Sequence, residues 1–203
     1  MNGWSTAADR MRRLCVYCGS SAGRDPAYVN AARDLGRELA ARGIGLVYGG
    51  ASVGVMGALA DAVLQAGGQA TGVIPRALAV KELAHPGLNE QHVVESMHER
   101  KAMMVELADG FIALPGGWGT MEELCEVLTW AQLGFHRKPC GLLNVNGYFD
   151  ALYAFLEHAI AEGFVRPGYR ELLVLEDDIG RLLQRFDTYD PPMVRKWISE
   201  AET

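Results

Sequence analysis

The sequence predicts an α/β fold: a Rossmann-like, doubly wound parallel sheet with helices on both faces. Short apolar segments alternate with longer helical patterns from residue 13 to about 187, and this alternation is typical of parallel βαβ units. Three glycine-rich turns follow apolar segments and lead into helices or loops. A chain of 203 residues is long enough for one well-cored domain and short for two. We therefore expect one domain over residues 13–187, a flexible N-terminal segment over 1–12 and a C-terminal tail over 188–203.

The first part of the chain is expected to contain three strands and two helices. In order these are a strand at 14–17, a turn at 19–21, a helix from 25 to 43, a strand at 45–48, a glycine-rich turn at 49–54, a helix at 56–64 and a strand at 70–74. Asp25 and Pro26 suit the start of the first helix, and Gly43 suits its end. Pro75 ends the third strand. The irregular, polar residues 76–89 are expected to form a flap, and such a loop beside a site is often functional.

The second part of the chain continues the alternation. In order we expect a short strand at 92–94, a helix containing 97–101, a strand at 108–113, a helix to about 133, a strand at 140–144, a helix through 155, a strand at 172–175 and a helix at 178–186. Ligands bind outside the carboxyl ends of the strands in open parallel sheets. The turns Gly19–Ser21, Gly49–Gly54 and Pro115–Thr120 should therefore share one rim.

The segment Pro115-Gly116-Gly117-Trp118-Gly119-Thr120 follows a buried strand and opens a helical pattern. Its glycines bring backbone N–H groups close to a ligand, and the dipole of the helix favours an anion, most naturally a phosphate. Thr120 is expected to cap this helix and to place Glu123 in its first turn. A carboxylate repels a bound phosphate, so the presence of Glu123 favours a catalytic site over a site that only binds phosphate. The alternative is a capping box, in which Glu123 only satisfies a backbone N–H of the cap.

The composition excludes several classes of partner. The formal net charge is -6, whereas a nucleic-acid-binding surface needs a basic excess. No run approaches the roughly eighteen apolar residues of a membrane span, and the first dozen residues lack a signal-peptide core. We therefore expect no nucleic-acid partner, no membrane partner and a cytoplasmic location.

Neither redox chemistry nor a bound metal is indicated. Cys15 and Cys18 form a C-x-x-C pair within an apolar strand, where they would point to opposite faces. Cys125 and Cys140 are isolated, although a zinc site would need a second close pair. All four cysteines are expected to be free thiols packed as small hydrophobic side chains. The glycine spacing is not the G-x-G-x-x-G fingerprint, so a mononucleotide fits better than NAD.

Four segments carry a resemblance to a known family. They are Gly49-Gly50-Ala51, Met97-His98-Glu99-Arg100-Lys101, Pro115-Gly116-Gly117-Trp118-Gly119-Thr120-Met121-Glu122-Glu123 and Thr129-Trp130-Ala131-Gln132-Leu133-Gly134. Together they resemble the signatures of the LONELY GUY (LOG) family of cytokinin riboside 5′-monophosphate phosphoribohydrolases, often labelled "possible lysine decarboxylase". The likeness covers roughly residues 13–187. The pairing of M-H-x-R-K with P-G-G-x-G-T-x-x-E is highly specific, and neither pattern is broken.

The resemblance implies hydrolysis of the N-glycosidic bond of an adenosine 5′-monophosphate, often N6-substituted, to a free base and ribose 5-phosphate, with no cofactor. It implies that Arg100 and Glu123 are the catalytic pair and that the protein is a homodimer. Substrate-binding positions fall on Glu82, Arg100, Lys101, Gly117, Trp118, Gly119, Thr120, Met121, Glu122, Glu123 and Thr129. The other glycine-rich turns add Gly49, Gly50 and Ser20 as binding candidates.

The chemistry of the catalytic pair agrees with this assignment. Breaking a glycosidic bond builds positive charge on the ribose, so Glu123 would stabilise the transition state or activate the attacking water. Arg100 keeps its proton because an arginine guanidinium is effectively always charged in proteins, and it should orient the carboxylate and hold phosphate or ribose oxygens. We see no second carboxylate to protonate the leaving base.

Other residues of these motifs have plainer alternatives. His98 is more often a packed or capping residue than a catalyst. Lys101 fits a solvated surface lysine as well as it fits a phosphate ligand. Trp130, Met103 and Met104 are expected in the core or at a subunit contact, with adenine packing as the alternative.

Three other functions are less compatible with the sequence. Amino-acid decarboxylation needs a Schiff-base lysine, pyridoxal phosphate and normally a larger chain. A metal-dependent nucleoside hydrolase needs an aspartate cluster, and nothing like D-x-D-x-x-x-D-D occurs. A purine-nucleotide sensor without turnover would use the same glycine loops, but it would bind phosphate better without Glu123.

Overall fold

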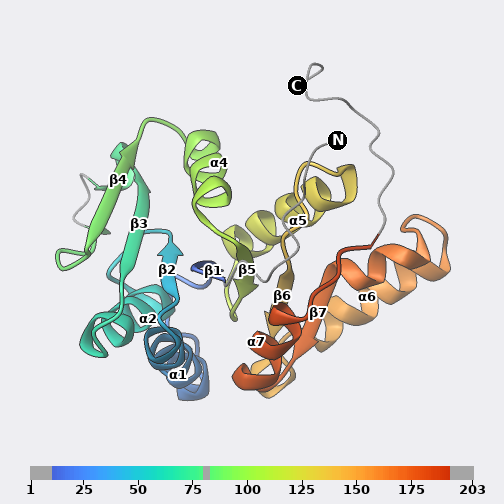
Figure 1. Cartoon of the computed structure of the whole chain (residues 1–203), viewed down its shortest axis with the longest axis horizontal. Coiled ribbons are helices and arrows are strands. Elements are labelled where there is room, and N and C mark those ends of the chain that lie inside the picture. Colours follow the sequence, from blue (N-terminus) through green and yellow to red (C-terminus); the bar gives the residue numbers. More distant parts are fainter. Residues whose placement is uncertain (1–10, 80–82, 193–203) are drawn as a thin grey trace.

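A seven-stranded sheet forms the centre of the computed structural model, which describes residues 11–79 and 83–192 (Figure 1). Its strands are β1 (Arg13–Tyr17), β2 (Gly45–Tyr48), β3 (Ala70–Pro75), β4 (Glu90–Val94), β5 (Gly110–Ala113), β6 (Cys140–Leu143) and β7 (Leu173–Glu176). Their order across the sheet is β4-β3-β2-β1-β5-β6-β7, and every neighbouring pair is parallel. The predicted α/β fold is confirmed.

Helices cover both faces of this sheet. They are α1 (Pro26–Arg42), α2 (Gly54–Gln65), α3 (Arg76–Leu78), α4 (Met97–Leu107), α5 (Trp118–Leu133), α6 (Asp150–Ala161) and α7 (Ile179–Asp187), with short 3-10 turns at η2 (Val145–Gly147) and η3 (Pro167–Leu172). Helices α1, α2 and α7 pack on one face, and α4, α5 and α6 pack on the other (Figure 1). Each face has its own apolar cluster, as expected for strands buried on both sides.

Helix α1 shows how the sequence sets an element's ends. The Asp25 carboxylate accepts the Ala27 N–H at 2.8 Å, Pro26 is the first helical residue, and Gly43 ends the helix with a left-handed φ of 69°. These residue types suit these positions, and the predicted helix is confirmed. Its buried residues include Leu35 and Leu39, each of which stabilises the fold by about 1.5–3 kcal/mol.

The predicted boundaries differ from the structure mainly between β3 and β4. The expected flap begins with the short helix α3, and residues 83–85 then run beside the turn after β2. The Ser52 N–H donates to the Leu83 carbonyl and the His85 N–H donates to the Gly50 carbonyl, both at 2.9 Å. The flap is thus partly held by backbone hydrogen bonds. Glu82 lies outside the described residues, as do 1–10 of the expected N-terminal segment and 193–203 of the tail.

The strand order reverses between β1 and β5. From β1 the chain builds outward through β2, β3 and β4, then returns to place β5 on the other side of β1. The connections after β1 and β5 therefore leave toward opposite faces and open a crevice, where sheets of this kind bind ligands. None of the helices in the described ranges is long and apolar enough to cross a membrane.

Three of the four cysteines are buried in the core. Cys15 and Cys18 lie in different apolar clusters, as expected for opposite faces of the sheet. Burial raises the pKa of the Cys15, Cys18 and Cys140 thiols well above the usual range, which disfavours the reactive thiolate. The prediction that Cys125 is packed inside is wrong, because it lies on an exposed position of α5.

We expect only Cys125 to react readily with Ellman's reagent in the native protein, because the other three thiols are buried and protonated. Absorbance at neutral pH should report about one thiol before unfolding in guanidinium and all four afterwards. A Cys125→Ala variant is the matched control and should lose the native reaction. Fast modification of a second thiol would show that the core opens around β1 or β6.

Candidate active site

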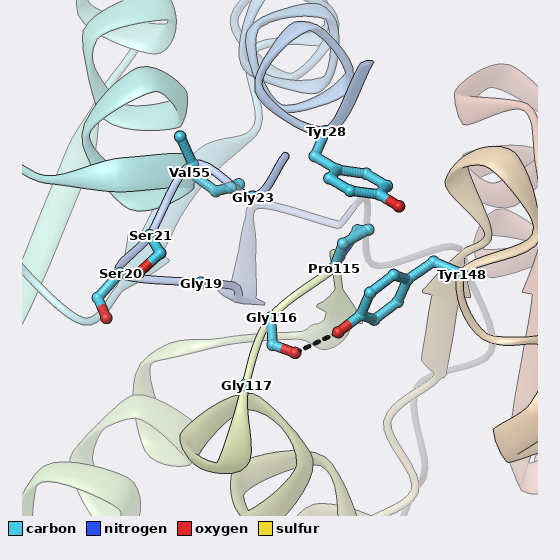
Figure 2. A pocket seen from close by; sticks show the side chains of 11 residues that line it. Gly19, Ser20, Ser21, Gly23, Tyr28, Val55, Pro115, Gly116, Gly117 and Tyr148 are labelled. Atoms are coloured by element: carbon cyan, nitrogen blue, oxygen red, sulfur yellow. Dashed lines mark hydrogen bonds between the residues drawn. The ribbon is translucent and has the colours of Figure 1, made fainter. Parts of the chain in front are cut away.

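A cavity of about 220 Å³ lies at the carboxyl ends of β1 and β5. It is lined by the loops after these strands and by two tyrosines: Gly19, Ser20, Ser21, Ala22, Gly23, Tyr28, Val55, Pro115, Gly116, Gly117 and Tyr148 (Figure 2). The Gly19 N–H donates to the Pro115 carbonyl at 3.2 Å, and the Met56 N–H donates to the Gly19 carbonyl at 3.2 Å. The three predicted turns therefore share one rim.

Helix α5 begins earlier than the sequence predicts. Its first residue is Trp118, its N-cap is Gly117, and no side chain caps it. The prediction that Thr120 caps the helix is wrong, because the chain already turns into the helix at the glycines, and Thr120 lies buried in the first turn. Glu123 lies in the second turn, so the capping-box alternative is also wrong.

The glycines of this loop have different roles. A Cβ at Gly116 would lie 2.0 Å from Thr120 Oγ1, so Gly116 is required by internal packing. A Cβ at Gly117 or Gly119 would meet no atom within 4 Å, and both residues are exposed. Their missing side chains leave the first N–H groups of α5 bare to solvent. A long helix with an uncapped, open N-terminus suits an anion.

Arg100 lies in the first turn of α4 with its side chain buried. Ser96 caps this helix by accepting the Glu99 N–H at 3.1 Å. The Arg100 guanidinium then crosses the ends of β2 and β3: its Nε donates to the Val73 carbonyl at 3.1 Å, and a Cβ at Gly49 would lie 2.2 Å from its Nη2. Gly49 is therefore needed to make room for Arg100, and a side chain there would displace the guanidinium.

Glu123 forms a buried ion pair with Arg100. Arg100 Nη1 lies 3.1 Å from Glu123 Oε1, and the two side chains are 8% and 5% exposed. Burial raises the pKa of Glu123 to about 7, although the Arg100 charge opposes this shift. A carboxyl that titrates near neutrality can exchange a proton during turnover. The structure thus brings together the two residues that the sequence analysis singles out as catalytic.

Lys101 has a different set of partners. Its Nζ lies 2.5 Å from Glu122 Oε1 and 3.0 Å from Glu126 Oε1. The alternative of a solvated surface lysine is wrong, because Lys101 is only 7% exposed. Burial opposes the charged form, yet the two carboxylates outweigh it and raise the pKa of Lys101. Glu122 and Lys101 thus lie next to the Arg100–Glu123 ion pair and are bound to each other.

Arg100, Lys101 and Glu123 are not among the residues that line this cavity, and neither are several other candidates. The Thr129 hydroxyl donates to the Cys125 carbonyl at 2.7 Å and lines a second cavity between α5, α6 and η3. His98 is exposed rather than packed, and Trp118 is 92% exposed at the start of α5. The three side chains expected in the core or at a subunit contact differ in burial: Met104 is in the core, while Met103 and Trp130 are partly buried. No group of three or more His, Cys, Asp or Glu side chains in residues 11–79 and 83–192 is arranged to hold a metal.

Sequence reasoning missed the tyrosines and one carbonyl of the site. Tyr28 from α1 and Tyr148 from the loop before α6 line the cavity, and the Val73 carbonyl holds Arg100. These groups come from elements distant in sequence and belong to none of the recognised motifs. Only the strand order, which the sequence analysis does not predict and which brings the ends of β1, β5 and β6 together, could have indicated the tyrosines.

The chain is similar to several known proteins. Residues 56–186 match the family model described as "Possible lysine decarboxylase". The chain is 51% identical over 191 residues to the probable cytokinin riboside 5′-monophosphate phosphoribohydrolase LOGL9 of Oryza sativa subsp. japonica, covering 94% of this chain and 84% of the relative. It is 50% identical over 182 residues to the cytokinin riboside 5′-monophosphate phosphoribohydrolase LOG7 of Arabidopsis thaliana, covering 90% and 84%.

Solved structures with lower sequence identity share the fold. The molybdenum cofactor binding protein of Rippkaea orientalis superposes with a TM-score of 0.68 at 21% identity, over 89% of this chain and 98% of that one. The Moco carrier protein of Chlamydomonas reinhardtii gives a TM-score of 0.65 at 22% identity, over 87% and 99%. At this identity the likeness concerns the architecture alone.

The raised pKa of Glu123 predicts a pH-dependent stability. A carboxyl with a higher pKa in the folded protein contributes stability that is complete below its ordinary value of 4.5 and is lost as pH rises through about 7. Relative to Glu123→Gln, the free energy of unfolding should fall by about 3 kcal/mol between about pH 4 and about pH 8. Urea unfolding of both proteins across this range measures the difference. If the free energy of unfolding of the parent instead rose with pH relative to that of Glu123→Gln, the charge of Arg100 would outweigh burial and lower the pKa of Glu123.

Proposed function

The chain belongs to the LOG family of cytokinin riboside 5′-monophosphate phosphoribohydrolases, and we propose that Arg100 and Glu123 are the centre at which it hydrolyses its substrate. The observation that carries this proposal is the position of the buried pair relative to the bare N-terminus of α5. Glu123 lies five residues after Trp118, or about 7.5 Å along the helix axis. This separation is comparable to the length of a ribose 5-phosphate.

The helix N-terminus supplies a site for the 5′-phosphate. The exposed N–H groups from Gly117 onward lie at the positive end of the α5 dipole, which favours a doubly charged anion. A phosphate held there would direct the ribose toward Glu123. Binding energy from this remote group can then be used to position the reacting carbon.

Glu123 acts on the glycosidic carbon. In the reaction the bond between C1′ and the base nitrogen breaks, its electron pair leaves with the base, and a water oxygen bonds to C1′. The water loses one proton and the base gains one, so the products are the free base and ribose 5-phosphate. The ionised Glu123 stabilises the positive charge that develops on the ribose and can accept the proton of the water.

Arg100 sets the orientation and charge state of Glu123. Its guanidinium remains charged throughout, and the Val73 carbonyl and the ion pair fix its position. The positive charge opposes the effect of burial on Glu123 and keeps the carboxylate accessible near neutral pH. Its remaining N–H groups are free to contact ribose or phosphate oxygens.

The structure disfavours a lysine-based decarboxylase. A Schiff-base lysine needs a neutral amine and hence a lowered pKa. Lys101, which lies beside the site, has a raised pKa and is held by two carboxylates. Lys138 has a pKa lowered by burial, but it precedes β6 and lies at the amino end of the sheet, away from the cavity.

We also propose a substrate, a cellular location and an oligomeric state. We take the substrate to be adenosine 5′-monophosphate or an N6-substituted derivative, and the enzyme to be a cytoplasmic homodimer. Apolar side chains exposed at Val93, Met97 and Trp118 support a protein contact close to the site. Glu82, which lies outside the described residues, and Thr129, which lines the second cavity, are proposed as substrate contacts from the family resemblance alone.

Base release tests the proposed function directly. Purified protein incubated with AMP or with isopentenyladenosine monophosphate should release free base, measured by chromatography.

Glu123→Gln should bind AMP about as well by calorimetry while hydrolysis falls by roughly a thousandfold, because the charge is lost but the shape remains. In the parent, kcat/KM should rise with pH through about 7. Binding of AMP with no release of either base would support the nucleotide-sensor alternative, and full activity of Glu123→Gln would remove Glu123 from the mechanism.

Gly119→Ala separates the role of the bare helix end from that of packing. The added methyl has free space in the protein, and alanine in a helix is up to about 1 kcal/mol more stable than glycine. We expect an unchanged or slightly higher melting temperature but a KM for AMP raised at least about tenfold, because the methyl would crowd the phosphate. Gly168→Ala in η3 is the matched control, since its Cβ also meets no atom within 4 Å. Unchanged KM in Gly119→Ala would place the phosphate elsewhere.

A further inference from the structure

Tyr148 contacts the glycine-rich loop from outside the recognised motifs. Its hydroxyl donates a 2.6 Å hydrogen bond to the Gly116 carbonyl, across 32 positions of sequence (Figure 2). The residue stands between η2 and α6, at the carboxyl end of β6. An O–H···O bond of this length lies at the short end of the ordinary range.

The direction of this bond determines where the next N–H group points. The peptide joining Gly116 and Gly117 is trans, so its carbonyl and its N–H point in opposite directions. A Gly116 carbonyl turned toward Tyr148 therefore turns the Gly117 N–H away from Tyr148. Within the described part of the chain this N–H has no hydrogen-bond partner, and it is the first of the open donors at the start of α5.

The preceding peptide is held in a similar way. The Pro115 carbonyl accepts the Gly19 N–H at 3.2 Å, so the loop after β1 fixes one peptide and Tyr148 fixes the next. Gly117 and Gly119 have no side chains to hold their own conformation. The orientation of the Gly117 N–H is therefore imposed from outside the loop, whereas the N–H groups from Trp118 onward are set by α5 itself.

Tyr148 is 42% exposed, and two aromatic rings pack against it. Its ring packs edge-on against Tyr28, with centroids 5.5 Å apart, and against Phe149, with centroids 5.0 Å apart. The Phe149 N–H donates to Asn144 Oδ1 at 2.8 Å. Asn146, at a left-handed φ of 51°, donates its side-chain amide to Asp25 Oδ2 at 2.9 Å. The loop after β6 is thus joined to the start of α1, which limits the positions that the hydroxyl can take.

We propose that Tyr148 is a positioning residue of the nucleotide site, which aligns the Gly117 N–H with the 5′-phosphate through its bond to the Gly116 carbonyl. This inference rests on the proposed function, because it takes the ligand of the α5 N-terminus to be that phosphate. The phosphate stays bound in both the ground state and the transition state. Loss of the alignment should therefore raise KM and leave kcat nearly unchanged.

Tyr148→Phe tests this role by removing the hydroxyl and keeping the ring. We expect the KM for AMP to rise about five- to tenfold, the effect of one hydrogen bond. Competitive inhibition by ribose 5-phosphate should weaken by the same factor, whereas inhibition by free adenine and kcat should change less than about twofold. Tyr189→Phe is the matched control, because its hydroxyl lies outside the cavity and makes no hydrogen bond within the described residues. It should behave like the parent.

The selectivity of the effect distinguishes positioning from a structural role. Equal weakening of ribose 5-phosphate and adenine in Tyr148→Phe would indicate general loosening and overturn the proposal, as would an unchanged KM. Melting temperatures of both variants check that the fold is intact. If the parent released no base but bound AMP by calorimetry, the proposed function would fail, and the ratio of AMP affinities between parent and variant would still decide the role of Tyr148. If the parent bound no AMP, both proposals would fail.

Discussion

The buried ion pair between Arg100 and Glu123 is the constraint around which the site is built. Removing two charges from water is costly, and such pairs often stabilise a fold less than apolar residues of the same size would. The surrounding structure accommodates this one at several points: the Val73 carbonyl accepts from the guanidinium, and Gly49 gives up its side chain to make room for it. Stability alone would not select this arrangement. A carboxylate that titrates near neutrality provides a chemical reason for it.

The strand order explains why the pair and the cavity lie at the same edge of the sheet, although neither residue of the pair is among those that line the cavity. The reversal between β1 and β5 opens the crevice, and the crevice places the N-terminus of α5 beside the loop after β1. Helix α4 reaches the same place from the far side of β2, since its first turn lies against the end of β3. Residues from distant parts of the chain therefore converge because their strands end at one edge of the sheet.

Much of this could be predicted from the sequence, and the errors have physical causes. Alternating apolar runs and helical patterns predict the sheet and its rim, and α1 has the end residues that its structure uses. The sequence predicts too late a start for α5 because Thr-x-x-Glu is the pattern of a capping box, while a glycine N-cap has no side chain to reveal it. The partners of Lys101, and the bond from Tyr148 to Gly116, depend on contacts between elements. No local pattern encodes such contacts.

The charged side chains of α4 and α5 form two separate sets of ion pairs. Arg100 and Lys101 are neighbours in sequence, so about 100° of helical rotation separates their side chains. The same angle separates Glu122 from Glu123, while Glu122 and Glu126 share a face. Lys101 therefore binds the pair of glutamates on one face, and Arg100 binds the single glutamate on the other. Two of the three carboxylates on this part of α5 thus share the single positive charge of Lys101, which offsets part of their repulsion of a phosphate, while Glu123 is paired with Arg100 alone.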